Sequence, residues 1–126
     1  MTKKILIVDD EVHIRTLLEQ TLEDLEDDGV EILTGANGHE GLEIVRAERP
    51  DVVFLDVMMP KLSGFDVCEA IKNDQSTAAT FVVMLTAKGQ QADRAQGEAL
   101  GADVFATKPF DPDAMVDIAR KALGLA

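Results

Sequence analysis

The sequence of 126 residues has a single cysteine and neither tryptophan nor tyrosine. One cysteine excludes an intramolecular disulfide, and Cys68 lies on the apolar side of an expected helix, which indicates a buried structural thiol. Because tryptophan is absent, the usual intrinsic fluorescence signal is missing. No apolar run approaches the length of a membrane-spanning segment, and no signal peptide precedes the first expected strand. We therefore expect a cytoplasmic protein that does not insert into a membrane.

Basic residues are also scarce. The chain has 12 lysines and arginines against 24 aspartates and glutamates, and its formal net charge is −12. Binding to a phosphate backbone needs clustered lysine and arginine, so this composition argues against nucleic-acid binding by the domain. A surface of this charge attracts cations instead. At this length the whole chain, residues 1–126, is expected to form one domain.

Short apolar runs alternate with segments of helical periodicity along the chain. Runs such as Ile5-Leu6-Ile7-Val8 are typical of strands buried on both faces of a parallel sheet. The expected strands are residues 4–8, 30–34, 51–55, 81–85 and 103–107. The expected helices begin near residues 11, 37, 63, 90 and 111.

Two of these helices differ in their apolar content. The first is expected to run from residue 11 to about residue 26 and to end at Gly29. Its buried side is marked by a stripe at helical spacing, formed by Ile14, Leu17, Leu18, Thr21, Leu22 and Leu25. The fourth, residues 90–100, has mostly alanines as apolar residues and contains Gly97. We therefore expect the fourth helix to be held weakly and to be unusually mobile.

The alternation of strands and helices predicts an α/β fold. A parallel sheet with right-handed crossovers and helices on both faces satisfies this order. Helices can cover both faces only if the winding of the chain reverses, and the crevice at the reversal is where such sheets bind ligands. Acidic residues follow the first and third strands, which places the reversal between those two strands.

Five polar residues follow four of the apolar runs. Asp9 and Asp10 come after the first strand, Asp56 after the third, Thr86 after the fourth and Lys108 after the fifth. The carboxyl ends of neighbouring parallel strands meet at one edge of the sheet, so these side chains should share one pocket.

The residue types in this pocket favour a divalent cation and a phosphoryl group. Three acids brought together repel one another, and a hard cation such as magnesium relieves that repulsion through oxygen ligands. His13 and His39 are expected at the surface and no cysteine lies nearby, so zinc is disfavoured. Lysine and threonine can hold phosphoryl oxygens, and an aspartate can act as a nucleophile that forms an acyl phosphate.

The motifs resemble those of the receiver domain of two-component response regulators, in the family's order and spacing over nearly the whole chain. The matching segments are Ile5-Leu6-Ile7-Val8-Asp9-Asp10-Glu11, residues 51–60 with Gly64, Leu85-Thr86-Ala87, Gly101-Ala102-Asp103 and Thr107-Lys108-Pro109-Phe110. The resemblance implies a flavodoxin-like (βα)5 three-layer sandwich with a parallel sheet of order 2-1-3-4-5.

The resemblance also implies a role for each acidic residue in the pocket. Asp56 would accept the phosphoryl group. Asp10 would bind Mg²⁺ directly, and Asp9 would bind it largely through water. Asp56 and the backbone carbonyl of Met58 would complete the protein ligands, and Mn²⁺ is a possible substitute for Mg²⁺.

Three further residues would respond to phosphorylation. Thr86 and Lys108 would bind phosphoryl oxygens, and Phe105 stands where the family has an aromatic switch residue. The Thr86 hydroxyl would move toward the phosphoryl group, and the ring of Phe105 would turn into the space it leaves. The Lys108–Pro109 peptide would be cis, which aims the lysine inward.

The partners implied by the resemblance are proteins. A sensor histidine kinase or a histidine phosphotransfer protein would donate the phosphoryl group. A downstream protein, or an output domain outside this sequence, would recognise the face formed by the fourth helix, fifth strand and fifth helix. The domain would be a monomer or a weak, phosphorylation-dependent dimer, and not an enzyme beyond its own phosphorylation and dephosphorylation.

Two other functions remain open from the residues alone. A magnesium-dependent phosphatase with an aspartyl nucleophile usually has a second acid two residues after the nucleophile, where this chain has Met58. A flavodoxin-like small-molecule binder would need a phosphate-binding loop after the first strand, where Asp9-Asp10-Glu11 would repel a phosphate.

We expect the phosphorylated protein to lose its phosphoryl group slowly. Met58 and Lys88 occupy two positions that influence this rate in the family, and neither is an acid or amide that would position an attacking water. We expect an acyl-phosphate lifetime well beyond seconds, measured by following the phosphorylated protein after removal of the donor. A lifetime of seconds would contradict this expectation.

Overall fold

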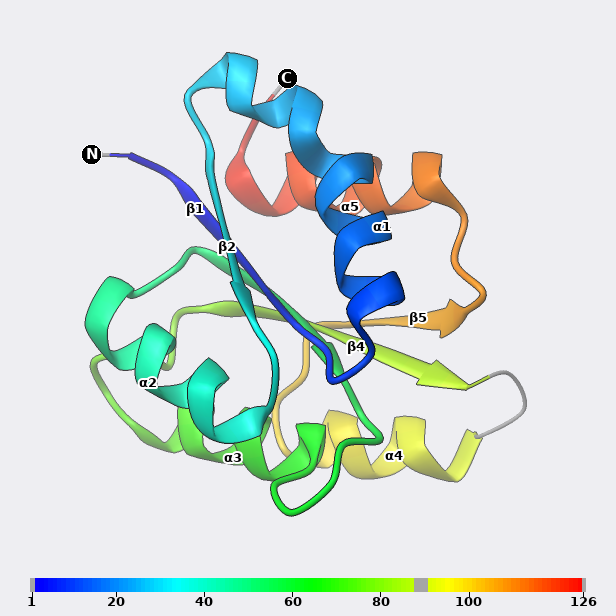
Figure 1. Ribbon diagram of the computed structural model, residues 1–126. Helices are drawn as coiled ribbons and strands as arrows, with labels where there is room; N and C mark the ends of the chain where they lie inside the picture. The colour runs from blue at the N-terminus through cyan, green and yellow to red at the C-terminus, as the bar shows by residue number, and fades with distance from the viewer. Residues whose placement is uncertain (1, 88–90, 126) are drawn as a thin grey trace.

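The computed structural model describes residues 2–87 and 91–125, which form a parallel sheet between two layers of helices (Figure 1). The strands are β1 (Lys4–Val8), β2 (Glu31–Gly35), β3 (Val52–Asp56), β4 (Phe81–Ala87) and β5 (Val104–Lys108). They lie in the order β2-β1-β3-β4-β5, and every neighbouring pair is parallel. The predicted sheet and its strand order are therefore confirmed.

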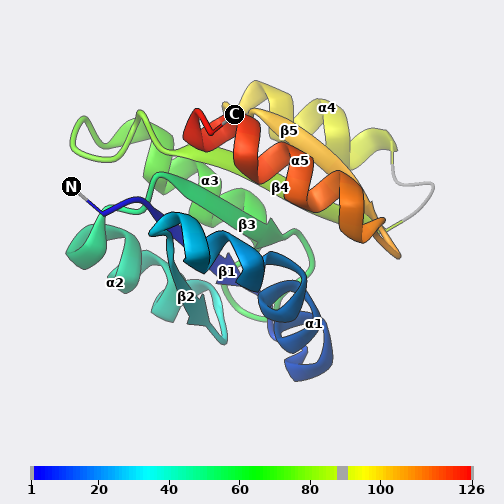
Figure 2. The same ribbon diagram turned by 90° about the horizontal axis from the view of Figure 1, so that it is seen from above.

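Helices cover both faces of this sheet. The helices are α1 (Val12–Leu22), α2 (Gly38–Glu48), α3 (Gly64–Asn73), α4 (Gln91–Ala99) and α5 (Pro112–Leu123), with a 3-10 helix, η1 (Glu23–Asp28), after α1. Figure 2 shows α1 and α5 on one side of the sheet and α2, α3 and α4 on the other. The winding reverses between β1 and β3, as the acidic residues predicted.

Alternating side chains of each strand build two separate cores. Ile5 and Ile7 of β1 pack under α1 and α5, whereas Leu6 and Val8 pack under α2 and α3. The alternation follows from the two-residue period of a strand, and it explains why the strands are apolar throughout. Cys68 is buried in the second core, and burial raises the pKa of its thiol to about 11, as expected of a structural thiol.

The first helix differs from its prediction in where it ends and in the exposure of one residue of its apolar stripe. The α-helix stops at Leu22, and the acidic segment that follows tightens into η1 before Gly29, at φ 84°, ends it. Acidic side chains are unfavourable at the negative end of a helix dipole, which accounts for the early stop. Leu17, predicted in the buried stripe, is 46% exposed because it lies about 100° around the helix from the buried Leu18.

Side-chain caps stabilise the starts of three other helices. The side chain of Asn37 accepts a hydrogen bond from the backbone N–H of Glu40. Ser63 and Asp66 form a reciprocal capping box at the start of α3. Asp111 accepts from the N–H of Asp113, and Pro112 is the first residue of α5. In the described part of the chain, no helix is both long and apolar enough to cross a membrane.

Helix α4 is anchored differently from the others. Between Arg94 and Ala99, Gly97 is buried and every other residue is exposed. By contrast, α1 buries Leu18 and Leu22, and α5 buries Met115 and Ala119. The segment before α4, including Lys88, lies outside the described residues.

This anchoring generates a prediction about local stability. Amides of α4 should exchange with solvent markedly faster than those of α1, because the described residues of α4 bury no apolar side chain of their own. Hydrogen–deuterium exchange measured by mass spectrometry on the free protein would test this. Equal protection of α4 and α1 would contradict it.

Candidate functional site

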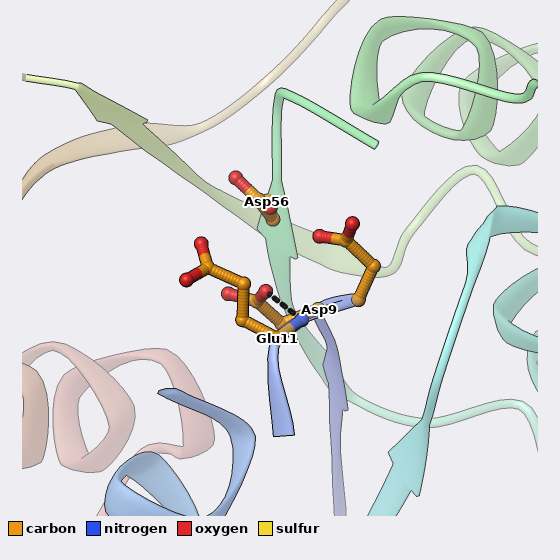
Figure 3. A group of neighbouring side chains, drawn as sticks. Asp9, Glu11 and Asp56 are labelled. Atoms are coloured by element: carbon orange, nitrogen blue, oxygen red, sulfur yellow. Dashed lines mark hydrogen bonds between the residues drawn. The ribbon is translucent and has the colours of Figure 1, made fainter. Parts of the chain in front are cut away.

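Four of the five polar residues predicted to converge meet at the carboxyl edge of the sheet, namely Asp9, Asp10, Asp56 and Lys108. Asp9 follows β1, Asp56 ends β3 and Lys108 ends β5. Thr86 is the second-last residue of β4 and is paired in register with Thr107 of β5. Asp9, Asp56 and Thr86 are 0%, 4% and 5% exposed, so the site is set into the domain. Figure 3 shows Asp9 and Glu11 beside Asp56, although they come from different strand ends.

The ammonium of Lys108 connects the buried acids. Its Nζ lies 3.0 Å from Oδ2 of Asp9 and 3.1 Å from Oδ1 of Asp56. The carboxylate of Glu11 lies at 3.9 Å, at the outer side of the group. The Lys108–Pro109 peptide is cis, as predicted. One lysine therefore compensates two carboxylates that have almost no contact with solvent.

Four carboxyl groups lie close enough together to hold a metal ion. Oxygen atoms of Asp9, Asp10, Glu11 and Asp56 all lie within 4.8 Å of one another. A set made only of carboxylate oxygens suits a hard divalent cation and not zinc. The residues present therefore fit a magnesium-like ion, and His13 and His39 are exposed, as expected. Glu11 was not among the predicted ligands, although its place next to Asp9-Asp10 was a usable signal.

Hydrogen bonds hold the segment around Asp9 in place. The N–H of Glu11 donates to Oδ1 of Asp9 over 2.9 Å. Nη1 of Arg15 donates to the backbone carbonyl of Asp9 over 2.7 Å. Nothing in the sequence pattern indicated Arg15, because its role depends on where α1 packs relative to the end of β1.

Close backbone packing positions Asp56. Gly64 begins α3 and donates its N–H to the carbonyl of Val57 over 3.0 Å. A Cβ atom at residue 64 would overlap the carbonyl oxygen of Asp56 and would come within 2.8 Å of the Cα of Val57. Only glycine allows α3 to start this close to the end of β3.

The loop after β3 gives Asp56 a further hydrogen-bond donor. The N–H of Met58 donates to Oδ1 of Asp56 over 3.3 Å. Met58 itself is 65% exposed. Phe105 of β5 is half-buried on the face that α2, α3 and α4 cover.

Burial and charge set the protonation of the central groups. Burial, followed by the negative charge of Asp9, raises the pKa of Asp56 to about 6, although Lys108 opposes the change. Burial alone would lower the pKa of Lys108, but its hydrogen bonds and ion pairs with Asp9 and Asp56 outweigh it, so that pKa is raised. The lysine thus stays charged at neutral pH while Asp56 is costly to ionise.

The chain as a whole matches a known family. The family model for the response regulator receiver domain matches residues 5–120. The chain belongs to this family. Phosphotransfer to an aspartate is the role of such domains, which act as signalling switches in two-component systems and interact with histidine kinases.

Curated relatives of this receiver domain are considerably longer proteins. The probable transcriptional regulator ycf27 of Cyanophora paradoxa is 47% identical over 87% of this chain and 44% of the relative. The alkaline phosphatase synthesis transcriptional regulatory protein PhoP of Bacillus subtilis is 45% identical over 89% of this chain and 45% of its own length. The receiver domain thus spans less than half of the length of these relatives.

Solved structures confirm the receiver fold. Chemotaxis protein CheY4 of Vibrio cholerae has a TM-score of 0.85 at 32% identity, covering 97% of this chain and 99% of that one. The signal receiver domain of the DNA-binding response regulator merR from Colwellia psychrerythraea has a TM-score of 0.89 at 28% identity. The match covers 97% of this chain and 98% of that one. The predicted flavodoxin-like class of fold is therefore confirmed.

The raised pKa of Asp56 predicts how the stability of the metal-free domain depends on pH. The ordinary pKa is 3.8 and the folded value is about 6, so folded protein binds this proton more tightly than unfolded chain. The stability that goes with the protonated carboxyl is present below pH 3.8 and is lost as pH rises through about 6. Asp56→Asn should therefore stabilise the domain at pH 7.5 by about 1–3 kcal/mol, and by less at pH 4.5.

Urea unfolding followed by far-UV circular dichroism in buffer with a chelator would measure this difference. Asp117→Asn serves as the control, because Asp117 is exposed on α5 and pairs only with Lys121 among the described ion pairs. A stabilisation by Asp56→Asn that is the same at both pH values would contradict the prediction.

Proposed function

We propose that residues 1–126 form one receiver domain in which Asp56 takes a phosphoryl group from a phosphohistidine. The donor would be a sensor histidine kinase or a histidine phosphotransfer protein. The observation that carries the assignment is the position of Lys108, whose Nζ lies 3.0 Å from Asp9 and 3.1 Å from Asp56. A lysine held there by two buried acids has its charge where a phosphoryl group on Asp56 would add negative charge.

A magnesium ion fits the acidic side of this site, and Mn²⁺ offers the same ligand chemistry. Asp10 would bind it directly, Asp9 through water, and Asp56 and the backbone carbonyl of Met58 would complete the set. The ion supplies positive charge that offsets the acids and the oxygens of the transferring group. The close approach of the four carboxyl groups supports this assignment.

The remaining residues hold the transferring group. An oxygen of ionised Asp56 attacks the phosphorus atom, a new O–P bond forms, and the P–N bond to the donor imidazole breaks with its electron pair on nitrogen. Lys108 and Thr86 would bind the oxygens of the phosphoryl group, where charge is spread in the transition state. Met58 offers no acid two residues after Asp56, so the domain would not turn over small phosphate esters.

The phosphoryl group would be read out through Thr86 and Phe105. Only an arrangement in which the Thr86 hydroxyl and Lys108 reach the phosphoryl oxygens gains those contacts, so phosphorylation favours that arrangement. Rotation of the Phe105 ring would then change the face formed by α4, β5 and α5. A downstream protein or an output domain would bind this face in the cytoplasm, and the domain itself would not bind nucleic acid. It would be a monomer or a weak, phosphorylation-dependent dimer.

The assignment of Asp56 predicts a specific covalent product. Incubation with Mg²⁺ and acetyl phosphate should add a single acid-stable, base-labile phosphoryl group, seen as one mass increment in the intact protein. Asp56→Asn should lose this increment, and Lys108→Arg should slow its appearance at least tenfold, because the guanidinium cannot reproduce the position of the ammonium.

Two controls make the result specific. Asp117→Asn removes an exposed acid far from the site and should leave the increment unchanged. A chelator should prevent the reaction of the wild-type protein. Phosphorylation that persists in Asp56→Asn, or repeated turnover of a phosphomonoester, would overturn the proposal.

A further inference from the structure

We propose that Gly97 of α4 positions the ring of Phe105, and that the contact between them is the principal attachment of α4 to the sheet. The functional part of this inference rests on the proposed role of Phe105 as the switch residue. Gly97 and the neighbouring Arg94 are therefore positioning residues, which act through Phe105 and not on the phosphoryl group.

The space beside Gly97 is filled by the phenyl ring. A Cβ atom at residue 97 would lie 2.5 Å from Cζ and 2.7 Å from Cε1 of Phe105. Real Cβ atoms do not approach other carbon atoms so closely, so the ring can occupy this position only while residue 97 lacks a side chain. We call this the Phe105–Gly97 contact.

Two further residues lie beside this contact. The guanidinium carbon of Arg94 lies 5.6 Å from the centroid of Phe105, within the range of a cation–π interaction. Arg94 is also 3.5 Å from the carboxylate of Glu98, which lies one helical turn further along α4. The edge of Phe65 on α3 would lie 3.6 Å from the same Cβ position. Arg94 and Gly97 thus hold one ring from a single face of α4.

The burial pattern makes this contact important for the whole helix. From Arg94 to Ala99, Gly97 is the one buried residue, so the described side chains of α4 contribute no buried apolar anchor of their own. Glycine is unfavourable inside a helix compared with alanine, and its presence here is explained by the ring that it admits. When the ring leaves Gly97, α4 loses the group that packs most closely against its buried residue.

The contact therefore couples the position of Phe105 to the stability of α4. Any change that moves the ring away from Gly97 should loosen α4, and any change that loosens α4 should free the ring. This is a route by which an event beside Thr86 reaches the surface formed by α4, β5 and α5.

A double-mutant cycle tests the contact without phosphorylation. Gly97→Ala should increase amide exchange in α4 on the order of tenfold, because the methyl group displaces the ring. In the Phe105→Ala background the same substitution should slow exchange in α4, because only the gain in helix propensity remains. Phe110→Ala, which removes a ring from the opposite core, should leave exchange in α4 unchanged.

The sign of the effect decides the inference. The inference would be overturned if Gly97→Ala changed amide exchange in α4 in the same direction in the wild-type and Phe105→Ala backgrounds. If Gly97→Ala alone does not fold, the double variant with Phe105→Ala must fold for the inference to stand, since it removes the clashing ring.

The position of the ring gives a second, independent readout. The chain has five phenylalanines and no other aromatic type except histidine, so ring-labelled phenylalanine should give a sparse NMR spectrum. The Phe105 signal, assigned with Phe105→Leu, should shift in Gly97→Ala and, to a smaller extent, in Arg94→Gln. An unmoved Phe105 signal in Gly97→Ala would overturn the inference.

Failure of the proposed function is distinguishable from failure of this contact. Beryllium fluoride with Mg²⁺, a mimic of the phosphoryl group, should move the Phe105 signal and increase exchange in α4 in the wild type but not in Asp56→Asn. Suppose that the mimic changes neither the Phe105 signal nor exchange in α4, while Gly97→Ala still has opposite effects on exchange in the two backgrounds. In that case the switch role of Phe105 is wrong and its structural contact with Gly97 stands. If the mimic moves the Phe105 signal and increases exchange in α4, but Gly97→Ala changes exchange in the same direction in both backgrounds, the inferred role of the Phe105–Gly97 contact is wrong and the proposed function stands.

Discussion

The ion pairs of Lys108 with Asp9 and Asp56 are the interaction on which the site depends. They connect the end of β5 to the ends of β1 and β3 across the edge of the sheet, over 3.0 Å and 3.1 Å. Two buried carboxylates would otherwise repel each other without solvent to screen them. The lysine makes this concentration of negative charge tolerable in the fold, and the remaining excess of acid leaves the site suited to a divalent cation.

Close packing and hydrogen bonds of the backbone, in addition to the ion pairs, position these charged groups. Gly64 lets α3 begin against the carbonyl of Asp56, and the N–H of Met58 reaches the carboxylate of the same residue. On the other side of the site, Arg15 of α1 holds the carbonyl of Asp9. These backbone contacts surround the acids. Helix α4 has one buried residue between Arg94 and Ala99, Gly97, and the atoms nearest to that residue belong to the ring of Phe105.

Much of this architecture could be predicted because it depends on local patterns. Apolar runs such as Val52-Val53-Phe54-Leu55 can be buried on both faces only within a covered parallel sheet, so the strands followed from the pattern, whereas their order was implied by the resemblance to receiver domains. The end of α1 and the exposure of Leu17 were predicted wrongly, because helical spacing shows which residues can share a face and not how wide the covered face is. The hydrogen bond of Arg15 could not be predicted, since it depends on where α1 packs relative to the end of β1, whereas Glu11 was missed although it follows Asp9-Asp10 directly.

The sequence by itself determined the fold class, the family and the residues that carry charge at the strand ends, because each follows from residue type and spacing along the chain. Only the tertiary structure decided how those charges compensate one another, that Asp56 is costly to ionise, and that Phe105 lies on Gly97. The physical reason is that pKa values, ion pairs and ring contacts depend on distances between elements that are far apart in the chain. Residues 56 and 108, or 97 and 105, acquire their properties from neighbours that only folding supplies.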